Sequence, residues 1–415
     1  MEQKLHTPEG VRDIYNRECE KKISLQKKLS TVLHQYGYQD IQTPTFEYYD
    51  VFREEIGSTS TRELYKFFDR DGNILSLRPD ITPSIARAAA TLFENEDFPL
   101  HLCYAGNTFI NHSSYQGRLK ENTQLGAELI GDDSIEADAE MLAMVVDGLK
   151  KIGLKEFQVN IGHVDFIHSL LESTDLEEAE KEEIRTLIVN RNYFGVEEIL
   201  DNRKAEKAVK EAFRILPELM GGPEILEPAA AVAPSAEARL AITRLQHIYD
   251  LLKLYGAEDH ITFDLSMTGS YGYYSGIVFR AYTYGTGDAV VRGGRYDHLL
   301  EKFGKNTPSI GFAIILDELL SAMDRQKIET PAEHRNLIVY TEETERQAVS
   351  MARNFRNKGK NILLMKRESE DGREKFEAYG KRSSVVSMLY LRDDLKIEMV
   401  NLVTGEEKVI DTAKK

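Results

Sequence analysis

In the stretch Glu121-Asn122-Thr123-Gln124-Leu125-Gly126-Ala127-Glu128, the two-residue period of a β-strand puts Gln124, Gly126 and Glu128 on one face. Gln124 and Glu128 then lie about 13 Å apart, and Gly126 leaves the floor between them without a side chain. Such a face suits a small zwitterion, held by an amide at one end and a carboxylate at the other. An ordinary solvated strand face is the alternative.

The segments around this strand predict an antiparallel sheet with helices on its faces, which is an α+β fold. A helix is expected over 23–36, and Asp71-Gly72 between two apolar runs marks a hairpin turn. The other elements expected here are strands over 101–110 and 156–161, and helices over 83–92 and 135–152.

From about 165 to 255 the sequence is charged and helix-favouring, which predicts a helical insertion. Strand patterns resume at 261–265, and a helix over 311–323 closes a first domain of residues 1–327. The polar stretch that contains Pro331 is predicted to be a linker. Strands and helices then alternate, which predicts a small α/β domain over 332–415.

The composition is that of a soluble globular chain, with 415 residues of which 41% are hydrophobic and 29% charged. No apolar run approaches the roughly 20 residues of a membrane-spanning helix, and the first ten residues lack a signal-peptide pattern. We therefore expect a cytoplasmic protein without membrane contact. Cys19 and Cys103 have no Cys/His cluster near them in the sequence, so we expect neither disulfides nor a metal, and no cofactor.

The formal net charge of −16 repels nucleic-acid phosphates at long range, which argues against tRNA binding. The sequence also lacks the motifs of phosphate-binding loops, dinucleotide-binding folds, zinc proteases and serine hydrolases. Common nucleotide and hydrolase machinery is therefore not expected.

Two further segments carry polar side chains next to structural signals. Asp80 and Thr82 precede a helix, where a carboxylate and a hydroxyl either bind an ammonium group or cap the helix. Tyr273 and Tyr274 lie close to Gly276, which permits close approach of a ligand or of another strand. Core packing explains the two tyrosines equally well.

Together these segments resemble the histidyl-tRNA synthetases of class II. The resemblance rests on ordered blocks between about residues 5 and 325: Thr7-Pro8-Glu9-Gly10-Val11-Arg12-Asp13, Leu77-Arg78-Pro79-Asp80, Gln124-Leu125-Gly126-Ala127-Glu128, Tyr273-Tyr274, Gly293-Gly294-Arg295-Tyr296-Asp297 and Gly311-Phe312-Ala313. It implies a class II synthetase-like fold and, from the first helix and the strand before Pro44, a dimer. The C-terminal domain resembles a shortened anticodon-binding domain.

The resemblance also identifies positions at which this sequence departs from the synthetases. Where those enzymes hold ATP with arginines, this chain has Ile110, Gly269 and Glu318, and it has His112 in place of an acidic residue. Adenylation develops charge on phosphate oxygens, and removing one stabilising donor costs about a hundred- to a thousand-fold in rate. We therefore expect no catalytic residues and no aminoacylation.

The positions that face the amino acid in the synthetases persist, and by resemblance they form a histidine-binding site: Asp80, Thr82, Gln124, Glu128, Tyr273 and Tyr274. The resemblance implies that Asp80, Thr82 and Gln124 hold the α-amino group. Glu128 and Tyr274 match the residues that read the imidazole.

This combination resembles the regulatory subunits of ATP phosphoribosyltransferase, synthetase paralogues in histidine biosynthesis. The resemblance implies a homodimer core within a hetero-octamer that activates a short catalytic subunit and confers feedback inhibition by histidine. We expect the segment 271–276 to couple the two subunits. A divergent histidyl-tRNA synthetase is the alternative, and a tRNA-binding sensor is a third possibility.

Overall fold

The computed structural model describes residues 5–53, 59–96, 99–112, 118–268, 273–329, 335–368, 370–394 and 396–411. The chain divides into two compact units, one of Met1–Arg12 and Leu25–Glu329 and the other of Asp13–Ser24 and Thr330–Lys415. Among the described residues, no helix is both long enough and apolar enough to cross a bilayer.

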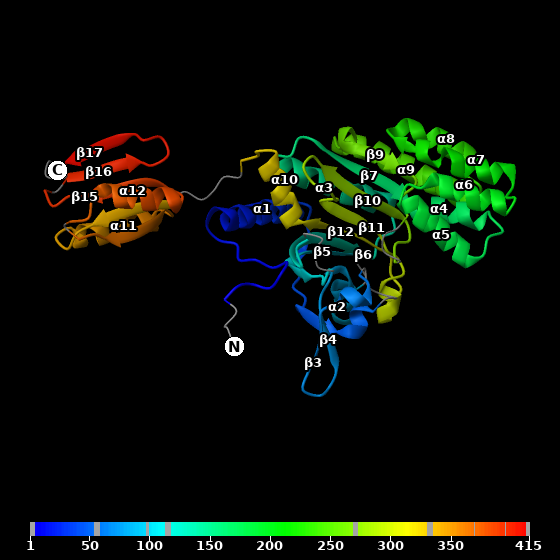
Figure 1. Ribbon diagram of the computed structural model, residues 1–415, viewed down its shortest axis with the longest axis horizontal. Coiled ribbons are helices and arrows are strands. Elements are labelled where there is room, and N and C mark those ends of the chain that lie inside the picture. The colour runs from blue at the N-terminus through cyan, green and yellow to red at the C-terminus, as the bar shows by residue number, and fades with distance from the viewer. Residues whose placement is uncertain are drawn as a thin grey trace. The chain divides into compact units, whose positions relative to one another are not determined.

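A nine-stranded sheet forms the centre of the first unit (Figure 1). Its six inner strands run antiparallel in the order β5 (Leu100–Phe109), β6 (Glu121–Ile130), β12 (Ser309–Ile315), β11 (Val291–Arg295), β10 (Ile277–Thr283) and β7 (Phe157–His163). The outer strands are β1 (Gln39–Asp40) beside β5, and β9 (Ile261–Asp264) and β8 (Met220–Gly221) beyond β7. The predicted antiparallel sheet is confirmed, and parallel pairs occur at β1–β5 and β7–β9.

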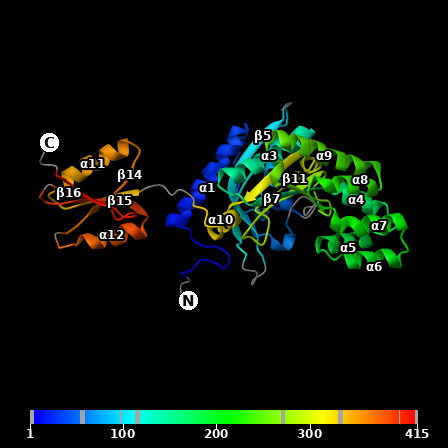
Figure 2. The same ribbon diagram turned by 90° about the horizontal axis from the view of Figure 1, so that it is seen from above.

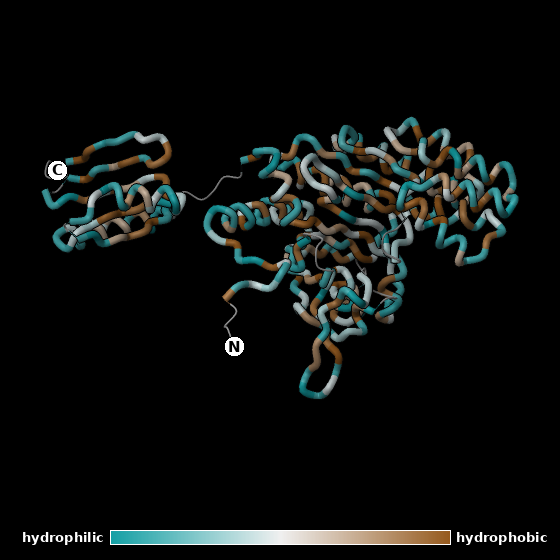
Figure 3. Tube along the Cα trace, in the orientation of Figure 1, coloured by the Kyte–Doolittle hydropathy of each residue, from teal (hydrophilic) through white to brown (hydrophobic). Residues whose placement is uncertain are grey.

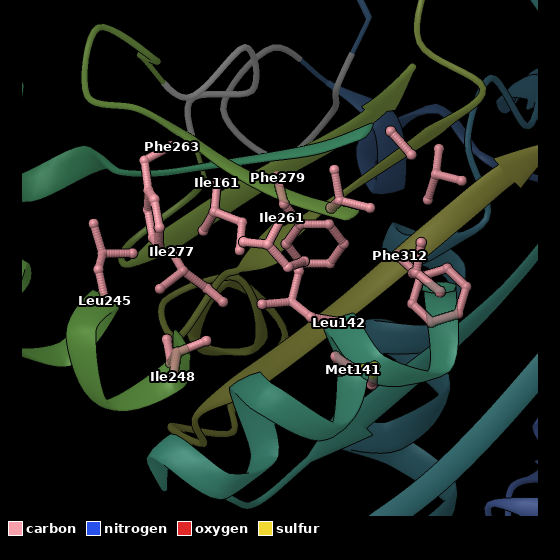
Figure 4. Close-up of a cluster of buried hydrophobic side chains, with 14 of the residues drawn as sticks. Met141, Leu142, Ile161, Leu245, Ile248, Ile261, Phe263, Ile277, Phe279 and Phe312 are labelled. Carbon is pink, nitrogen blue, oxygen red and sulfur yellow. The ribbon is translucent and has the colours of Figure 1, made fainter. Parts of the chain in front are cut away.

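The hydrophobic core lies on one face of this sheet. Helices α1 (Asn16–Gln35), α3 (Ile135–Lys151) and α9 (Ala236–Tyr255) contribute to it. Figure 4 shows Phe279 and Phe312 of the strands in the same buried cluster as Leu142 of α3 and Leu245 of α9. Burying such a side chain stabilises the fold by about 1.5–3 kcal/mol. The strand period turns the intervening residues toward the opposite face.

The region after residue 308 differs from the predicted helix over 311–323. Residues 309–315 form β12, and α10 (Leu316–Arg325) begins only after it. Gly311 pairs with Glu128 of β6 on one side and with Gly294 of β11 on the other. Two flanking ladders of hydrogen bonds therefore override the local helical pattern.

Helices separate β7 from β9: α4 (Val164–Glu172), α5 (Glu178–Val189), α6 (Tyr193–Asn202), α7 (Lys207–Ile215) and α8 (Leu226–Val232), followed by α9. Figure 2 shows α5 to α7 gathered at one end of the sheet. Ile184 and Phe213 of this helical lobe belong to the same buried cluster as the sheet. The lobe is thus an extension of the main core.

A second, three-stranded antiparallel sheet is formed by β2 (Phe46–Tyr48), β4 (Ile74–Leu77) and β3 (Lys66–Phe68), and it leads into α2 (Thr82–Leu92). The predicted turn at Asp71-Gly72 is confirmed, because Gly72 has φ +87°, which favours glycine. The hairpin turn is hydrophilic (Figure 3). Phe68 beside it is exposed.

The second unit contains a five-stranded sheet in the order β14, β13, β15, β16, β17. Its elements along the chain are β13 (Arg335–Tyr340), α11 (Glu345–Asn357), β14 (Asn361–Lys366), α12 (Arg373–Arg382), β15 (Val385–Leu391), β16 (Lys396–Asn401) and β17 (Glu407–Asp411). The two helices cover opposite faces, because Ala352 of α11 packs with Ile338 whereas Phe376 of α12 packs with Leu337.

Candidate functional site

Glycines on neighbouring strands line the face of the central sheet that is turned away from the core. Gly311 of β12 and Gly294 of β11 are cross-strand partners. A Cβ atom on Gly311 would overlap the Glu128 carboxylate, and one on Gly294 would lie 2.7 Å from the ring of Tyr274. These glycines therefore leave the space that the polar side chains of the site occupy.

Glu128 is completely buried on this face. Its Oε1 accepts a hydrogen bond from the Thr82 hydroxyl at 2.7 Å, and its Oε2 accepts one from the Tyr296 hydroxyl. Burial raises the pKa of Glu128 to about 8, against the opposing effect of these two hydrogen bonds. The side chain is thus mostly protonated at neutral pH, and a cationic ligand group would favour its ionised form.

Asp80 lies at the start of α2 and is buried. Its Oδ1 accepts the backbone N–H of Ile81 at 2.7 Å, and its Oδ2 accepts the Tyr273 hydroxyl at 3.5 Å. The capping role considered for Thr82 is wrong, because the helix begins at Thr82 itself and its hydroxyl donates to Glu128 instead. Asp80, by contrast, combines a backbone contact at the helix start with a contact to the site.

The tyrosines form one wall of the site. The ring centroids of Tyr273 and Tyr274 lie 5.1 Å apart, and those of Tyr273 and Tyr296 lie 5.9 Å apart. Both predicted tyrosines also pack against a second, smaller cluster of buried residues around Ile85, so they border the site and this cluster at once. Contacts therefore bring together five of the six predicted residues: Asp80, Thr82, Glu128, Tyr273 and Tyr274.

Gln124, the sixth, lies four residues before Glu128 on the same face of β6. Its Oε1 atom is buried and has no hydrogen-bond partner in the part of the chain that the structure describes. A buried acceptor left unpaired costs about 1–3 kcal/mol. A ligand that donates a hydrogen bond here would recover that cost.

Two tyrosines of the site were not predicted. Tyr296 donates to Glu128, and Tyr104 of β5 pairs across the strands with Gly126. The Tyr104 hydroxyl would lie 2.5 Å from a Cβ on Gly126, so this glycine makes room for it. Burial raises the pKa of Tyr104 well above its usual value. The strand pattern gives the facing of each tyrosine, but only the register between strands brings them to Glu128.

The positions predicted to have lost synthetase residues, arginines at Ile110, Gly269 and Glu318 and an acidic residue at His112, are partly described. Ile110 and His112 follow the end of β5, and Glu318 lies in the first turn of α10. An acidic side chain there complements the positive end of the helix dipole. Gly269 lies outside the described residues, as does 271–272 of the expected coupling segment.

Sequence reasoning also missed two arginines on the face of the sheet that carries Glu128. Arg280 of β10 and Arg292 of β11 are cross-strand partners, and Arg292 is two residues from Gly294 and therefore on the same face. Arg292 forms an ion pair with Asp288 at 2.5 Å. These strands thus bring cationic groups to this face.

The sheet and its helices are those of a class II synthetase-like protein. A family model described as histidyl-tRNA synthetase matches residues 10–319. The structure is similar in fold to histidyl-tRNA synthetase from Nostoc sp. PCC 7120, with a TM-score of 0.83 at 18% identity over 98% of this chain and 97% of that one.

Full-length comparisons define the family more narrowly. The chain is 37% identical over 407 residues to the ATP phosphoribosyltransferase regulatory subunit of Acetivibrio thermocellus, covering 98% of this chain and 97% of the relative. A crystal structure described as an ATP phosphoribosyltransferase regulatory subunit/histidyl-tRNA synthetase from Bacillus halodurans C has a TM-score of 0.83 at 30% identity, covering 94% of this chain and 98% of that one. The chain belongs to the family of ATP phosphoribosyltransferase regulatory subunits.

Proposed function

We propose that this chain is the histidine-sensing, non-catalytic subunit of an ATP phosphoribosyltransferase in histidine biosynthesis. It activates a short catalytic subunit and transmits histidine occupancy to it as feedback inhibition. The observation that carries the proposal is the cluster of acceptors around Glu128, which is built for a small ligand with several N–H donors. Family membership supports the regulatory role and the catalytic partner.

The contacts of the site suggest how histidine binds. Its α-amino group is a donor for Asp80 and for the unpaired Oε1 of Gln124. Its imidazole N–H competes with the Thr82 hydroxyl for Glu128, whose carboxylate gains charge-assisted hydrogen bonds when it ionises. Two acidic side chains on one buried face therefore select a ligand with two nitrogenous groups.

Thermodynamic linkage between histidine binding and the state of the assembly accounts for the feedback inhibition. Histidine shifts the balance between active and inhibited assemblies only if it binds the inhibited one more tightly. The proposed assembly is a homodimer core within a hetero-octamer, and the segment 271–276, which contains Tyr273 and Tyr274, is the proposed coupling element. Binding of tRNA is not part of this function.

A reconstituted enzyme tests the proposal. The chain should raise the activity of a short catalytic subunit, and histidine should lower the activity of the complex. With each complex normalised to its own activity without histidine, Glu128→Ala should raise the histidine concentration for half-inhibition more than tenfold, because the ligand loses a charge-assisted contact worth about 1.5–3 kcal/mol. The exposed control Glu156→Ala should leave it unchanged. Equal sensitivity of wild type and Glu128→Ala would contradict the proposal.

A working histidyl-tRNA synthetase is the second candidate, and Arg280 and Arg292 on the ligand-facing side favour it. Histidine-dependent exchange between ATP and pyrophosphate separates the two candidates. A sensor gives no exchange above a sample without histidine. Exchange that disappears in Arg280→Ala or Arg292→Ala would establish the synthetase instead.

A further inference from the structure

Within the described residues, His34, Asp40 and Cys103 form one group of metal-ligand type away from the histidine site, with the potential ligand atoms all within 4.8 Å of one another. His34 lies in the last turn of α1, Asp40 in β1 and Cys103 in β5. The parallel pairing of Asp40 with Cys103 brings together residues that are far apart in the sequence. The expectation of no metal rested on sequence neighbours, which do not show this cluster.

The distances approach those of a tetrahedral metal site. His34 Nε2 lies 3.0 Å from Asp40 Oδ2, and Cys103 Sγ lies 3.5 Å from Asp40 Oδ1. Tetrahedral zinc ligands are about 2.0–2.3 Å from the ion, so their donor atoms are about 3.3–3.7 Å apart. The two contacts go to different oxygens of Asp40, and one ligand atom from each of the three residues lies within 4.8 Å of the others, so a bound ion would draw the three donors closer together.

The arrangement does not suit nucleophilic catalysis. In a cysteine nucleophile the imidazole contacts the thiol and withdraws its proton. Here the carboxylate of Asp40 lies between the two groups, bonded to His34 through one oxygen and to Cys103 through the other. The imidazole of His34 is therefore not placed to withdraw the proton of the Cys103 thiol.

We propose that His34, Asp40 and Cys103 bind a divalent transition-metal ion of the zinc or cobalt type. One nitrogen, one oxygen and one sulfur donor suit such ions and not magnesium or calcium, which prefer oxygen ligands. The side chains of His34 and Asp40 are 46% and 68% exposed, so the ion enters from solvent and keeps water in its fourth position. The bound metal would tie the end of α1 to strands β1 and β5.

Cobalt(II) titration of the full chain, freed of any affinity tag, tests this site. One equivalent should produce a thiolate-to-cobalt charge-transfer band and the visible bands of a tetrahedral ion, and excess zinc should remove both. Cys103→Ser should abolish the charge-transfer band. His34→Gln changes an exposed side chain and should weaken cobalt binding by about tenfold or more. Loss of a residue that only hydrogen-bonds to a metal ligand already lowers metal affinity by about that factor.

Two matched variants serve as controls. Cys19→Ser removes the other cysteine, and His298→Gln removes an exposed histidine that also contacts a carboxylate. Both should bind cobalt as the wild type does. Absence of a thiolate band in the wild type, or its persistence in Cys103→Ser, would overturn the proposal.

Discussion

At the scale of single residues, the behaviour of the site depends on one buried carboxyl group. Glu128 is completely buried and held by Thr82 and Tyr296. Because its pKa in the folded chain is raised to about 8, the folded state binds a proton more tightly than the unfolded chain does. The stability from this proton is fully present below the ordinary glutamate pKa and is lost as the pH rises through about 8.

Glu128→Gln should therefore flatten the loss of stability between pH 6 and pH 9, since glutamine keeps the shape without ionising. Thermal unfolding at several pH values measures this. The melting temperature of the wild type should fall further over that range than that of the variant. The surface variant Glu156→Gln should behave like the wild type. Parallel curves for wild type and Glu128→Gln would rule out an elevated pKa.

Gly311 provides a second residue-scale prediction. A Cβ at this position would overlap the Glu128 carboxylate and lie 2.7 Å from the Ala127 carbonyl. Gly311→Ala should cost about 1–3 kcal/mol of unfolding free energy and should weaken histidine binding, because Glu128 must move. Gly287→Ala, with nothing near its Cβ position, is the matched control and should change neither.

At the scale of elements, sequence periodicity succeeded where the local pattern fits only one kind of element and failed where strand pairing decides between two. The strand β6 and the hairpin turn at Asp71-Gly72 follow from local pattern. β12 did not, because its run of apolar residues also fits a helix until its two flanking strands are known. Thr82 shows the same limit, since its partner Glu128 is 46 residues away.

A buried cluster of ion pairs joins helices α3 and α9 to the central sheet. Asp138 of α3 is fully buried, and it pairs with Arg295 of β11 at 2.5 Å and with Arg244 of α9 at 2.6 Å. Asp138→Ala should destabilise the chain by about 3–5 kcal/mol, because the buried Arg295 then loses its shorter ion pair and keeps the longer one to Asp297, at 3.3 Å. Urea unfolding measures the loss. The exposed pair of Asp250 and Lys253 offers the control Asp250→Ala, expected to cost less than about 1 kcal/mol.

At the scale of the whole molecule, the proposed histidine site combines residues from three distant segments, around Asp80, Glu128 and Tyr273. Resemblance to known sequences brought those segments together; periodicity alone gave only the face on which each side chain lies. Tyr104 and Arg292 went unpredicted because their places depend on strand register, and Tyr296 because its partner Glu128 is distant in the sequence. The same holds for Cys103, whose polar neighbours come from α1 and β1.

The most direct test of the account is a calorimetric titration of the full chain with L-histidine, in the wild type and in Gln124→Ala. We predict saturable binding of one histidine per wild-type chain, weakened in the variant by about tenfold, because each hydrogen bond to a charged group contributes about 1.5–3 kcal/mol. No heat of binding at millimolar histidine, or equal affinity in both proteins, would contradict the claim that this buried face is a histidine sensor.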